Sequence, residues 1–230
     1  MGIDETNTQF VPTVTKTRCR KGVKKVRLIG VGMEKPQITT TFGASASGKF
    51  VEPAQLIFGG TTVRCQYFDH TSSHWQTPES FITYITKTIL PFKTATIERL
   101  NLPQDQKMVL ILDLHYSHKS PAVLALLRAN NIIPVFIPAG CTDLHQLCDV
   151  ILNKSYKNGV KDAFVDYLSE QFRIWADTPD RDIINDVFTI NLALSVMKPL
   201  IPSFVGRGLA AISAEHMIEP IRTTFQENCL

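Results

Sequence analysis

Short stretches of alternating apolar and polar residues fill the first quarter of the chain. Alternation over 23–31, β-branched residues over 37–46 and a short apolar run over 54–58 predict three β-strands, separated by turns at Gly and Ser, in an antiparallel meander. After Thr77, which can act as a cap, the period changes to that of a helix. We expect this helix to end at Pro91, because an interior proline interrupts the hydrogen bonds of a helix.

The middle of the chain carries two unbroken apolar runs. Residues 108–112 and 132–137 have the continuous apolar character of strands, and 108–112 is expected to be buried on both faces. Between them, the pattern over 121–129 predicts a helix that a Ser-Pro pair begins and two asparagines end. A strand, a helix and a strand within about 30 residues form a right-handed βαβ unit with parallel strands.

Helical periodicity dominates the second half of the chain. A helix is expected over 147–172, and after a polar loop the segment 183–230 has the pattern of helices interrupted by prolines. This order of elements predicts an α/β fold with a mixed central sheet flanked by helices and with a helical C-terminal tail. We expect one domain, with its body over 1–172 and a helical extension over 173–230.

Composition narrows the class of protein. Of the 230 residues, 44% are hydrophobic and 20% are charged, which supports a packed core and excludes a disordered chain. The uncharged run 187–197 is shorter than the ~20 residues of a membrane-spanning helix, so no membrane partner is expected. The N-terminus lacks the apolar centre of a secretory signal. The 5 cysteines include no C-x-x-C pair, which favours a reducing compartment such as the nucleus or cytoplasm.

Positive charge is concentrated in one stretch of the chain, which we call the basic stretch. Seven of the 24 lysines and arginines fall in it, and the remaining 17 are outnumbered by the 21 acidic residues. The seven are Lys16, Arg18, Arg20, Lys21, Lys24, Lys25 and Arg27. Such a stretch attracts polyanions such as DNA through the release of counterions. A solvated surface hairpin explains the same residues equally well.

Three aspartates belong to elements that should meet at one edge of the sheet. Asp113 directly follows strand 108–112, at the carboxyl end where open α/β sheets bind ligands. Asp149 falls on the inward face of helix 147–172, and Asp4 lies just before the meander. Converging carboxylates suit Mg²⁺, and two such ions can clamp the attacking and leaving oxygens of a phosphodiester. Each aspartate also suits an ordinary cap, so both roles stay open on these residues alone.

Three patches of sequence together resemble the DDE transposase domain of the pogo/Tigger/jerky type. They are Asp4-Glu5-Thr6, LILDLHYSHKS at 110–120 and IPAGCTDLHQLCDVILNKSYK at 137–157. That family carries an aspartate in a D-E-T segment, a second after a hydrophobic strand, and a third before a helix. Asp4, Asp113 and Asp149 match these positions, and the 35 residues between the last two fit the family's spacing. The resemblance spans nearly the whole chain.

The resemblance implies an RNase H-like fold and a catalytic D-D-D site for two Mg²⁺ or Mn²⁺ ions. In such a site Asp4 and Asp113 share the metals, and Asp149 completes the second metal position. The implied activity is metal-dependent cleavage and strand transfer of DNA in the nucleus, a chemistry that commonly needs a second copy of the domain. No small-molecule cofactor is expected, because the chain lacks the glycine loops that bind dinucleotides or nucleoside triphosphates.

Departures from the family pattern keep an alternative open. Leu147 and Cys148 stand where the family has Pro-Leu, and only three residues precede Asp4. We therefore expect a clipped first strand and a catalytic domain without a preceding helix-turn-helix. The alternative is a catalytically inactive or domesticated transposase-derived module that binds nucleic acid through the basic stretch.

Several further residues are candidates for supporting roles. His118 matches the family's Ser-His position after Asp113 and either touches substrate or holds the loop. Gln146 stands at the family's glutamine, and Lys154 and Lys157 could meet DNA phosphate from the helix after Asp149.

Two alternative interpretations concern cysteine and tryptophan. Cys141, His145 and Cys148 lie close in sequence, but their spacing fits no usual zinc finger, so we disfavour zinc. Trp75 and Trp175 are expected to anchor edges of the core.

Overall fold

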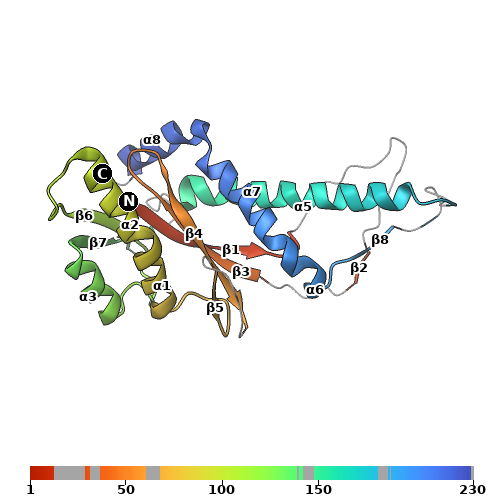
Figure 1. The fold of residues 1–230 in the computed structure, drawn as a ribbon, viewed down its shortest axis with the longest axis horizontal. Coiled ribbons are helices and arrows are strands. Elements are labelled where there is room, and N and C mark those ends of the chain that lie inside the picture. The colour runs from red at the N-terminus through yellow and green to blue at the C-terminus, as the bar shows by residue number, and fades with distance from the viewer. Residues whose placement is uncertain are drawn as a thin grey trace. The chain divides into compact units, whose positions relative to one another are not determined.

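The helices and strands of the chain are shown in Figure 1, a ribbon drawing of the computed structural model. They fall into two compact units, which are described separately below. Unit 1 comprises Met1–Thr8, Gln37–Ser155 and Ile212–Leu230, and unit 2 comprises Gln9–Pro36 and Tyr156–Ala211. The domain boundary expected at residue 172 stays a prediction. The structure describes residues 1–12, 29–31, 37–60, 68–138, 140–141, 148–180, 186 and 188–228.

A six-stranded mixed sheet forms the centre of unit 1. Its strand order is β5-β4-β3-β1-β6-β7, with β3 and β4 antiparallel and with β1, β6 and β7 parallel. This mixed sheet flanked by helices is the α/β architecture that the sequence predicted. The strands are β1 (Gly2–Gln9), β3 (Gln37–Ala44), β4 (Phe50–Gly59), β5 (Phe68–Thr71), β6 (Met108–Leu112) and β7 (Ile132–Phe136).

The predicted antiparallel meander is only partly correct. β3 and β4 do form an antiparallel pair, as expected for 37–46 and 54–58. The described part of the 23–31 strand is β2 (Ile29–Val31), which pairs in parallel with β8 (Thr189–Asn191) in unit 2. Alternation along a segment identifies a strand, but it carries no information about a partner so distant in sequence.

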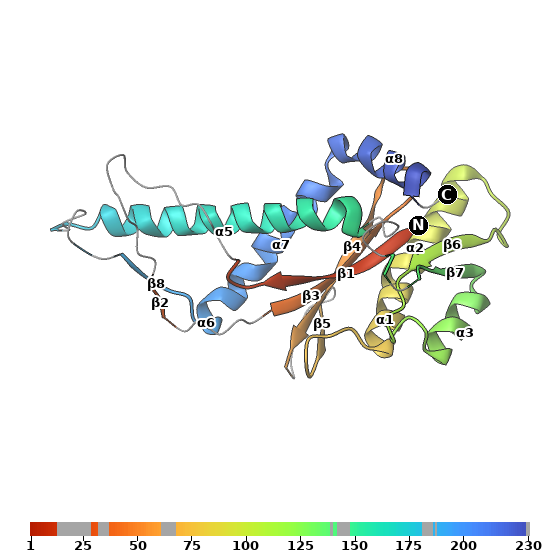
Figure 2. The ribbon, with the colours of Figure 1, turned by 180° about the vertical axis from the view of Figure 1, so that it is seen from behind.

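One face of the sheet is covered by the helices between β5 and β7. These are α1 (Pro78–Tyr84), α2 (Leu90–Leu100) and α3 (Pro121–Ala129), which Figure 2 shows beside β6 and β7. Thr77 and Ser80 form a reciprocal capping box that begins α1 as predicted. The buried core against this face consists of Ile3, Phe81, Tyr84, Ile85, Ile89, Leu110, Leu112, Val123, Leu127 and Ile132.

Pro91 does not end the helix that begins at Pro78, contrary to the prediction. A π-helical segment, η1 (Ile85–Ile89), joins α1 to α2, and helical backbone continues to Leu100. The widened turn changes the hydrogen-bond register just before the proline, which has no N–H to donate. The helix therefore continues past Pro91, but the face on which its apolar residues lie is rotated after the π-helical segment.

Strand β6 is not buried on both faces as expected. Leu110 and Leu112 are fully buried beneath the helices, whereas Val109 is 46% exposed. On the neighbouring β7, Ile133 and Val135 are exposed in the same way. The apolar run thus reflects strand-forming β-branched residues as well as burial, and the two cannot be separated by composition alone.

The long helix predicted over 147–172 is present and extends to Ala176. Its described part consists of a π-helical turn, η2 (Cys148–Leu152), followed by α5 (Asn153–Ala176), whereas residue 147 lies outside the described residues. In unit 2, α5 meets α7 (Ile201–Ser213) at two glycines, Gly159 and Gly208. A methyl group on Gly208 would lie 2.8 Å from both the Tyr156 ring and Val160, so this close approach requires glycine.

The C-terminal segment is helical apart from β8, which the sequence analysis missed. Its helices are α6 (Leu194–Met197), η3 (Lys198–Leu200), α7, η4 (Glu215–Met217) and α8 (Ile218–Asn228). Within the described part of the chain, no helix combines the length and the apolar character needed to cross a membrane.

Candidate functional site

Asp4 and Asp113 lie side by side on neighbouring parallel strands of unit 1. β1 and β6 pair in parallel with Gly2 opposite Ile111, so Asp4, two residues further along, is level with Asp113 at the end of β6. Asp4 is buried and Asp113 is half-buried. The register therefore places the backbones of Asp4 and Asp113 at the same level of the sheet, and their joint role as metal ligands stays a prediction.

Asn153 joins the third aspartate to the first. Its side-chain amide donates to Oδ2 of Asp4 at 3.1 Å and to Oδ1 of Asp149 at 2.7 Å. Asn153 itself is 8% exposed, and its Oδ1 is buried without a hydrogen-bond partner in the structure. A single buried amide thus connects the start of α5 with both carboxylates.

Asp149 does not point inward as predicted. Its side chain is exposed, and the neighbours that are buried are Cys148 and Leu152. The cause is the π-helical turn η2, which rotates the first residues of the helix relative to the α-helical phase assumed from sequence. Asp149 is nevertheless coupled to Asp4. It accepts a hydrogen bond from Asn153, and its negative charge raises the pKa of Asp4.

The surroundings of Asp4 strongly disfavour the ionised form of its carboxyl group. Burial raises the pKa of Asp4 well above its ordinary value, and the negative charges of Glu5, Asp149 and Asp113 raise it further. The hydrogen bond from Asn153 opposes this effect. A cation close to Asp4 would relieve both the desolvation and the repulsion.

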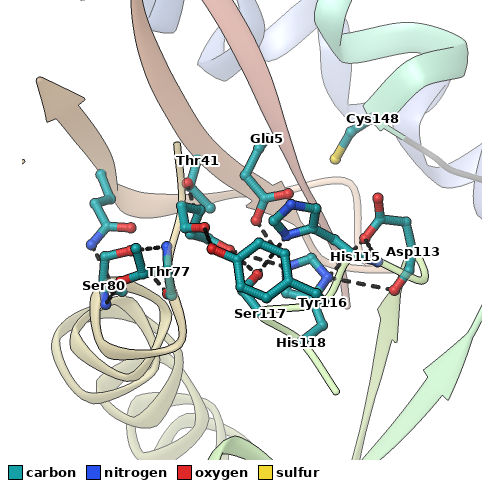
Figure 3. A network of polar contacts seen from close by, with 12 residues as sticks. Glu5, Thr41, Thr77, Ser80, Asp113, His115, Tyr116, Ser117, His118 and Cys148 are labelled. Atoms are coloured by element: carbon teal, nitrogen blue, oxygen red, sulfur yellow. Dashed lines mark hydrogen bonds and ion pairs between the residues drawn. The ribbon is translucent and has the colours of Figure 1, made fainter. Parts of the chain in front are cut away.

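His118 forms a buried bridge between two carboxylates. Its Nε2 lies 2.9 Å from Oε1 of Glu5, and its Nδ1 lies 2.7 Å from Oδ1 of Asp113. Burial lowers the pKa of His118, but Glu5 and Asp113 outweigh this effect and raise it to about 10. This raised pKa favours the protonated imidazole at neutral pH, and Figure 3 shows His118 between the side chains of Glu5 and Asp113.

The same contacts stabilise the ionised form of Asp113. Burial by itself would raise the pKa of Asp113, but hydrogen bonds from His118 and from the backbone amide of His115 lower it below the ordinary value. These contacts tie His118 to the loop after β6, and the choice between its two expected roles stays a prediction.

A network of neutral groups holds this bridge in place, as seen in Figure 3. Gln76 is 1% exposed, and its Oε1 accepts from Oγ of Ser117 and lies 3.1 Å from Nε2 of His118. The Gln76 amide donates to Oγ1 of Thr41 on β3. His115 Nδ1 lies 2.7 Å from the same Ser117 hydroxyl. Elements from three parts of unit 1 thereby fix the geometry of the acidic residues.

One group of side chains among the described residues could hold a metal ion together. Glu5, Asp113 and His118 have ligand atoms within 4.8 Å of one another, and this group includes neither Asp4 nor Asp149. Asp4 and Asp149 are instead connected by Asn153, whose Oδ1 is buried without a hydrogen-bond partner. Carboxylate and amide oxygens are the ligands that Mg²⁺ prefers.

A cavity of about 170 Å³ opens beside these acids, and we call it the acidic cleft. It is lined by Asp4, Glu5, Thr6, Asn7, Thr39, His74, Trp75, Gln76, Asp113 and His115. Trp75 is 54% exposed at this cleft, so the expectation that it anchors a core edge is wrong. Trp175, in unit 2, is half-buried and packs against Phe172 and Phe188 with ring centroids 5.5 Å from each.

Some of the expected site residues lie outside the described residues. They are Gln146 and His145, together with the whole basic stretch from Lys16 to Arg27. Lys154 and Lys157 are exposed on α5, and their contact with DNA phosphate stays a prediction. Of the disfavoured zinc group, Cys141 is half-buried, and Cys148 is buried with its Sγ 3.9 Å from the carbonyl oxygen of Phe42.

Three residues of the site were missed by the sequence analysis. Glu5 is part of the D-E-T segment, but only the aspartate of that segment was assigned a role. Asn153 follows Asp149 by one helical turn, a spacing that places two side chains on the same face. Gln76 had no local signal, because its partners belong to other elements.

A family model described as DDE superfamily endonuclease matches residues 35–198, a range that contains Asp113 and Asp149. A human protein described as "Pogo transposable element with ZNF domain" is 37% identical over 82 residues. That alignment covers 35% of this chain and 6% of the human protein, so this chain spans a small part of that relative.

Solved structures give a weaker likeness. The Mos1 transposase paired-end complex with left transposon end has a TM-score of 0.47 at 13% identity, covering 92% of this chain and 55% of that one. The Mos1 mariner paired end complex with Mn has a TM-score of 0.43 at 15% identity, covering 93% and 55%. The chain thus spans about half the length of these solved chains.

Proposed function

The chain belongs to the DDE superfamily endonuclease family, and we propose that its acidic cleft binds divalent metal ions and cleaves and transfers DNA phosphodiesters. The ions are Mg²⁺ or Mn²⁺, two per site, held by Asp4 and Asp113, which line the cleft, and by Asp149, which is not among the lining residues but is connected to Asp4 through Asn153. The observation that carries the proposal is the level placement of Asp4 and Asp113 on adjacent parallel strands, with Asn153 connecting Asp4 to Asp149.

The side chains around such a site have different roles. His118 and the His115 amide engage Oδ1 of Asp113, so Oδ2 is the oxygen that remains for a ligand. The side-chain amide of Asn153 donates to both Asp4 and Asp149 and so holds the two carboxyl groups near one another. Bound divalent ions supply Lewis acidity toward the phosphate and lower the pKa of an attacking water or hydroxyl. Because the carboxylates are already in position, little reorganisation of the site is needed at the moment of reaction.

Nicking of a supercoiled plasmid tests this proposal. The wild-type chain should nick the plasmid with Mg²⁺ or Mn²⁺ and stop when the ions are chelated. Asp113→Ala and Asp149→Ala should each lower the nicking rate at least about 100-fold, the scale expected for loss of an electrostatic catalytic group. Asp105→Asn, an exposed acid in a turn, is the matched control and should keep full activity. Metal-dependent nicking that survives both alanine changes would refute the assignment.

Metal binding can be measured independently of catalysis. Titration of Mn²⁺ followed by calorimetry should show saturable binding in the wild type and in Asp105→Asn. Binding should be lost in Asp113→Ala and in Asp149→Ala. If both variants bind as the wild type does, the metal site is elsewhere.

The second candidate is an inactive nucleic-acid-binding module. It is favoured by the seven cations of the basic stretch, which suit a sequence-independent contact with phosphate. This function predicts that DNA retention in chelator depends steeply on salt, and that it persists in Asp113→Ala. Replacing Lys24 and Lys25 by Gln should reduce the salt dependence, whereas no nicking would be seen under any metal condition.

Two features of the partners follow from the catalytic proposal. DNA as the substrate favours the nucleus as the site of action. Strand transfer joins two DNA ends, which a second copy of the domain would help to hold. Sedimentation with and without DNA measures this directly, and a complex containing a single copy on paired ends would contradict it.

A further inference from the structure

We propose that Trp75 is a stacking platform for an unpaired nucleotide base of the DNA strand whose phosphodiester enters the acidic cleft. This inference rests on the proposed function, and it adds a base-binding position next to the metal position. It assigns to Trp75 a role in holding DNA, separate from the chemistry at the carboxylates.

The position of Trp75 supports such a contact. Its side chain is 54% exposed while it lines the same cavity as Asp4 and Asp113. A large aromatic surface left in water costs free energy unless something covers it. The other tryptophan shows the contrasting case, because Trp175 is half-buried and packs against Phe172 and Phe188.

The backbone around Trp75 is fixed on both sides, which is unusual for an exposed side chain in a loop. The Thr71 hydroxyl donates to the carbonyl of Trp75 at 3.0 Å. The next residue, Gln76, is buried, and its side chain donates to Thr41 and accepts from Ser117. A ligand that binds the indole therefore pays little to order the loop beneath it.

Neighbouring aromatic rings extend the surface. His74 adopts a left-handed backbone conformation with φ of 61°, and its ring lies 5.2 Å from that of Trp75 at 31°. Tyr116 is 57% exposed, and its hydroxyl donates to the carbonyl of Gln76 at 3.1 Å. Left-handed conformations of residues other than glycine are costly and cluster at functional sites. The rim of the cleft thus presents the adjacent rings of His74 and Trp75 beside acidic oxygens, while Tyr116 is an exposed ring outside the lining residues.

Stacking explains why aromatic residues should stand beside a phosphodiester site. Every base has a π-face, so an aromatic platform binds single strands without reading their sequence. A base inside an intact duplex is already stacked, so Trp75 can reach only a base that has been unpaired or lies at a strand end. The occupant is therefore a base of single-stranded or distorted DNA.

Fluorescence of Trp75 tests the inference directly. The chain has 2 tryptophans, so Trp175→Phe leaves Trp75 as its sole indole. With Ca²⁺ present, adding a single-stranded oligonucleotide should quench this emission, and the quenching should saturate as the oligonucleotide concentration rises. An intact duplex of the same sequence should quench the emission less. Binding measured by anisotropy of a labelled strand should be roughly tenfold weaker in Trp75→Leu and little changed in Trp75→Phe.

The two substitutions separate stacking from simple apolar contact. Leucine keeps the bulk of an apolar side chain without a π-face, whereas phenylalanine keeps a smaller ring. Because Trp75 is exposed, neither change should unfold the chain, and circular dichroism checks this. Equal affinity of Trp75→Leu and wild type for the single strand, or saturating DNA binding without a change in Trp75 emission, would overturn the inference.

Failure of this inference can be distinguished from failure of the proposed function. Mn²⁺ binding and plasmid nicking depend on Asp113 and Asp149, and neither assay reports on the indole. If nicking is metal-dependent but Trp75 emission is indifferent to DNA, only the stacking platform is removed. If the single strand quenches Trp75 but no metal binds, the base position stands without the nuclease.

Discussion

The side-chain amide of Asn153 donates to Oδ2 of Asp4 across 3.1 Å and so connects the first turn of α5 to strand β1. Asp4 is 6% exposed, and among the described groups around it the acids Glu5, Asp149 and Asp113 all disfavour its charge. The amide of Asn153 is the contact that favours the ionised form. Four predictions follow from this and related contacts.

Asn153→Ala should destabilise the chain when metal is chelated. The change leaves the buried carboxylate of Asp4 without its donor and removes a second bond, to Asp149. A hydrogen bond to a charged group contributes about 1.5–3 kcal/mol, and the bond to the exposed Asp149 adds little because water screens it, so we expect a loss of about 2 kcal/mol in the free energy of unfolding. Urea unfolding in chelator measures it. Asn158→Ala, an exposed position on the same helix, is the control, and equal stability of the two variants would contradict the prediction.

Asp4→Asn should have opposite effects on stability and metal binding. The neutral amide removes a buried charge that three neighbouring acids repel, so the melting temperature in chelator should equal or exceed that of the wild type. The rise in melting temperature on adding Mn²⁺ should disappear, because a ligand stabilises a protein only by binding its folded state. Asp105→Asn should keep the Mn²⁺ effect. A variant that melts far below the wild type in chelator would argue that Asp4 has a purely structural role.

The His118 bridge should make stability depend on pH. The pKa of His118 is raised to about 10, above its value of about 6.5 in an unfolded chain. Its stabilisation is therefore fully present below about pH 6.5 and is lost as the pH rises through about 10. In chelator, the difference in unfolding free energy between the wild type and His118→Gln should shrink by a few kcal/mol across that range. A difference that stays constant from about pH 6 to about pH 10 would show that the bridge carries no net charge.

Two glycines of α7 should respond in opposite ways to alanine. Gly208→Ala places a methyl group 2.8 Å from Tyr156 and Val160, which should destabilise unit 2 by about 1–3 kcal/mol. Gly206→Ala meets nothing within 4 Å and should stabilise the helix by roughly 0.5–1 kcal/mol. Thermal unfolding followed by circular dichroism compares them. Similar melting temperatures for the two variants would disprove the close helix contact.

Local elements and the family were open to prediction because their signals are local. Ser120 caps α3 at the expected residue, and β6, α3 and β7 form the expected parallel βαβ unit. The resemblance to the DDE domain, based on three short patches, is confirmed by the family match over 35–198. Hydrophobic period, caps and short motifs depend on neighbours in the chain, so they can be recognised without knowledge of packing.

The phase of a helix proved harder to predict than its presence. Asp149 was expected on the inward face, and Pro91 was expected to end a helix. In both cases a π-helical segment shifted the register. Such a segment depends on the balance between packing of one face and hydrogen bonding along the backbone, and a fixed period of 3.6 residues cannot represent it.

By itself, the sequence determined the parallel βαβ unit, the β3–β4 pair and most of the helices, and through its resemblance to the DDE family it suggested which aspartates match that pattern. Only the tertiary structure decided that Glu5 pairs with His118, that Gln76 supports this pair, and that Asn153 joins Asp4 to Asp149. Each of these contacts links residues on separate elements, and it forms because the pairing of β1 with β6 brings the elements together. The pattern of apolar and polar residues indicates which side of each segment is buried. The hydrogen-bond partner of a buried polar group, in contrast, depends on which other segment packs against it.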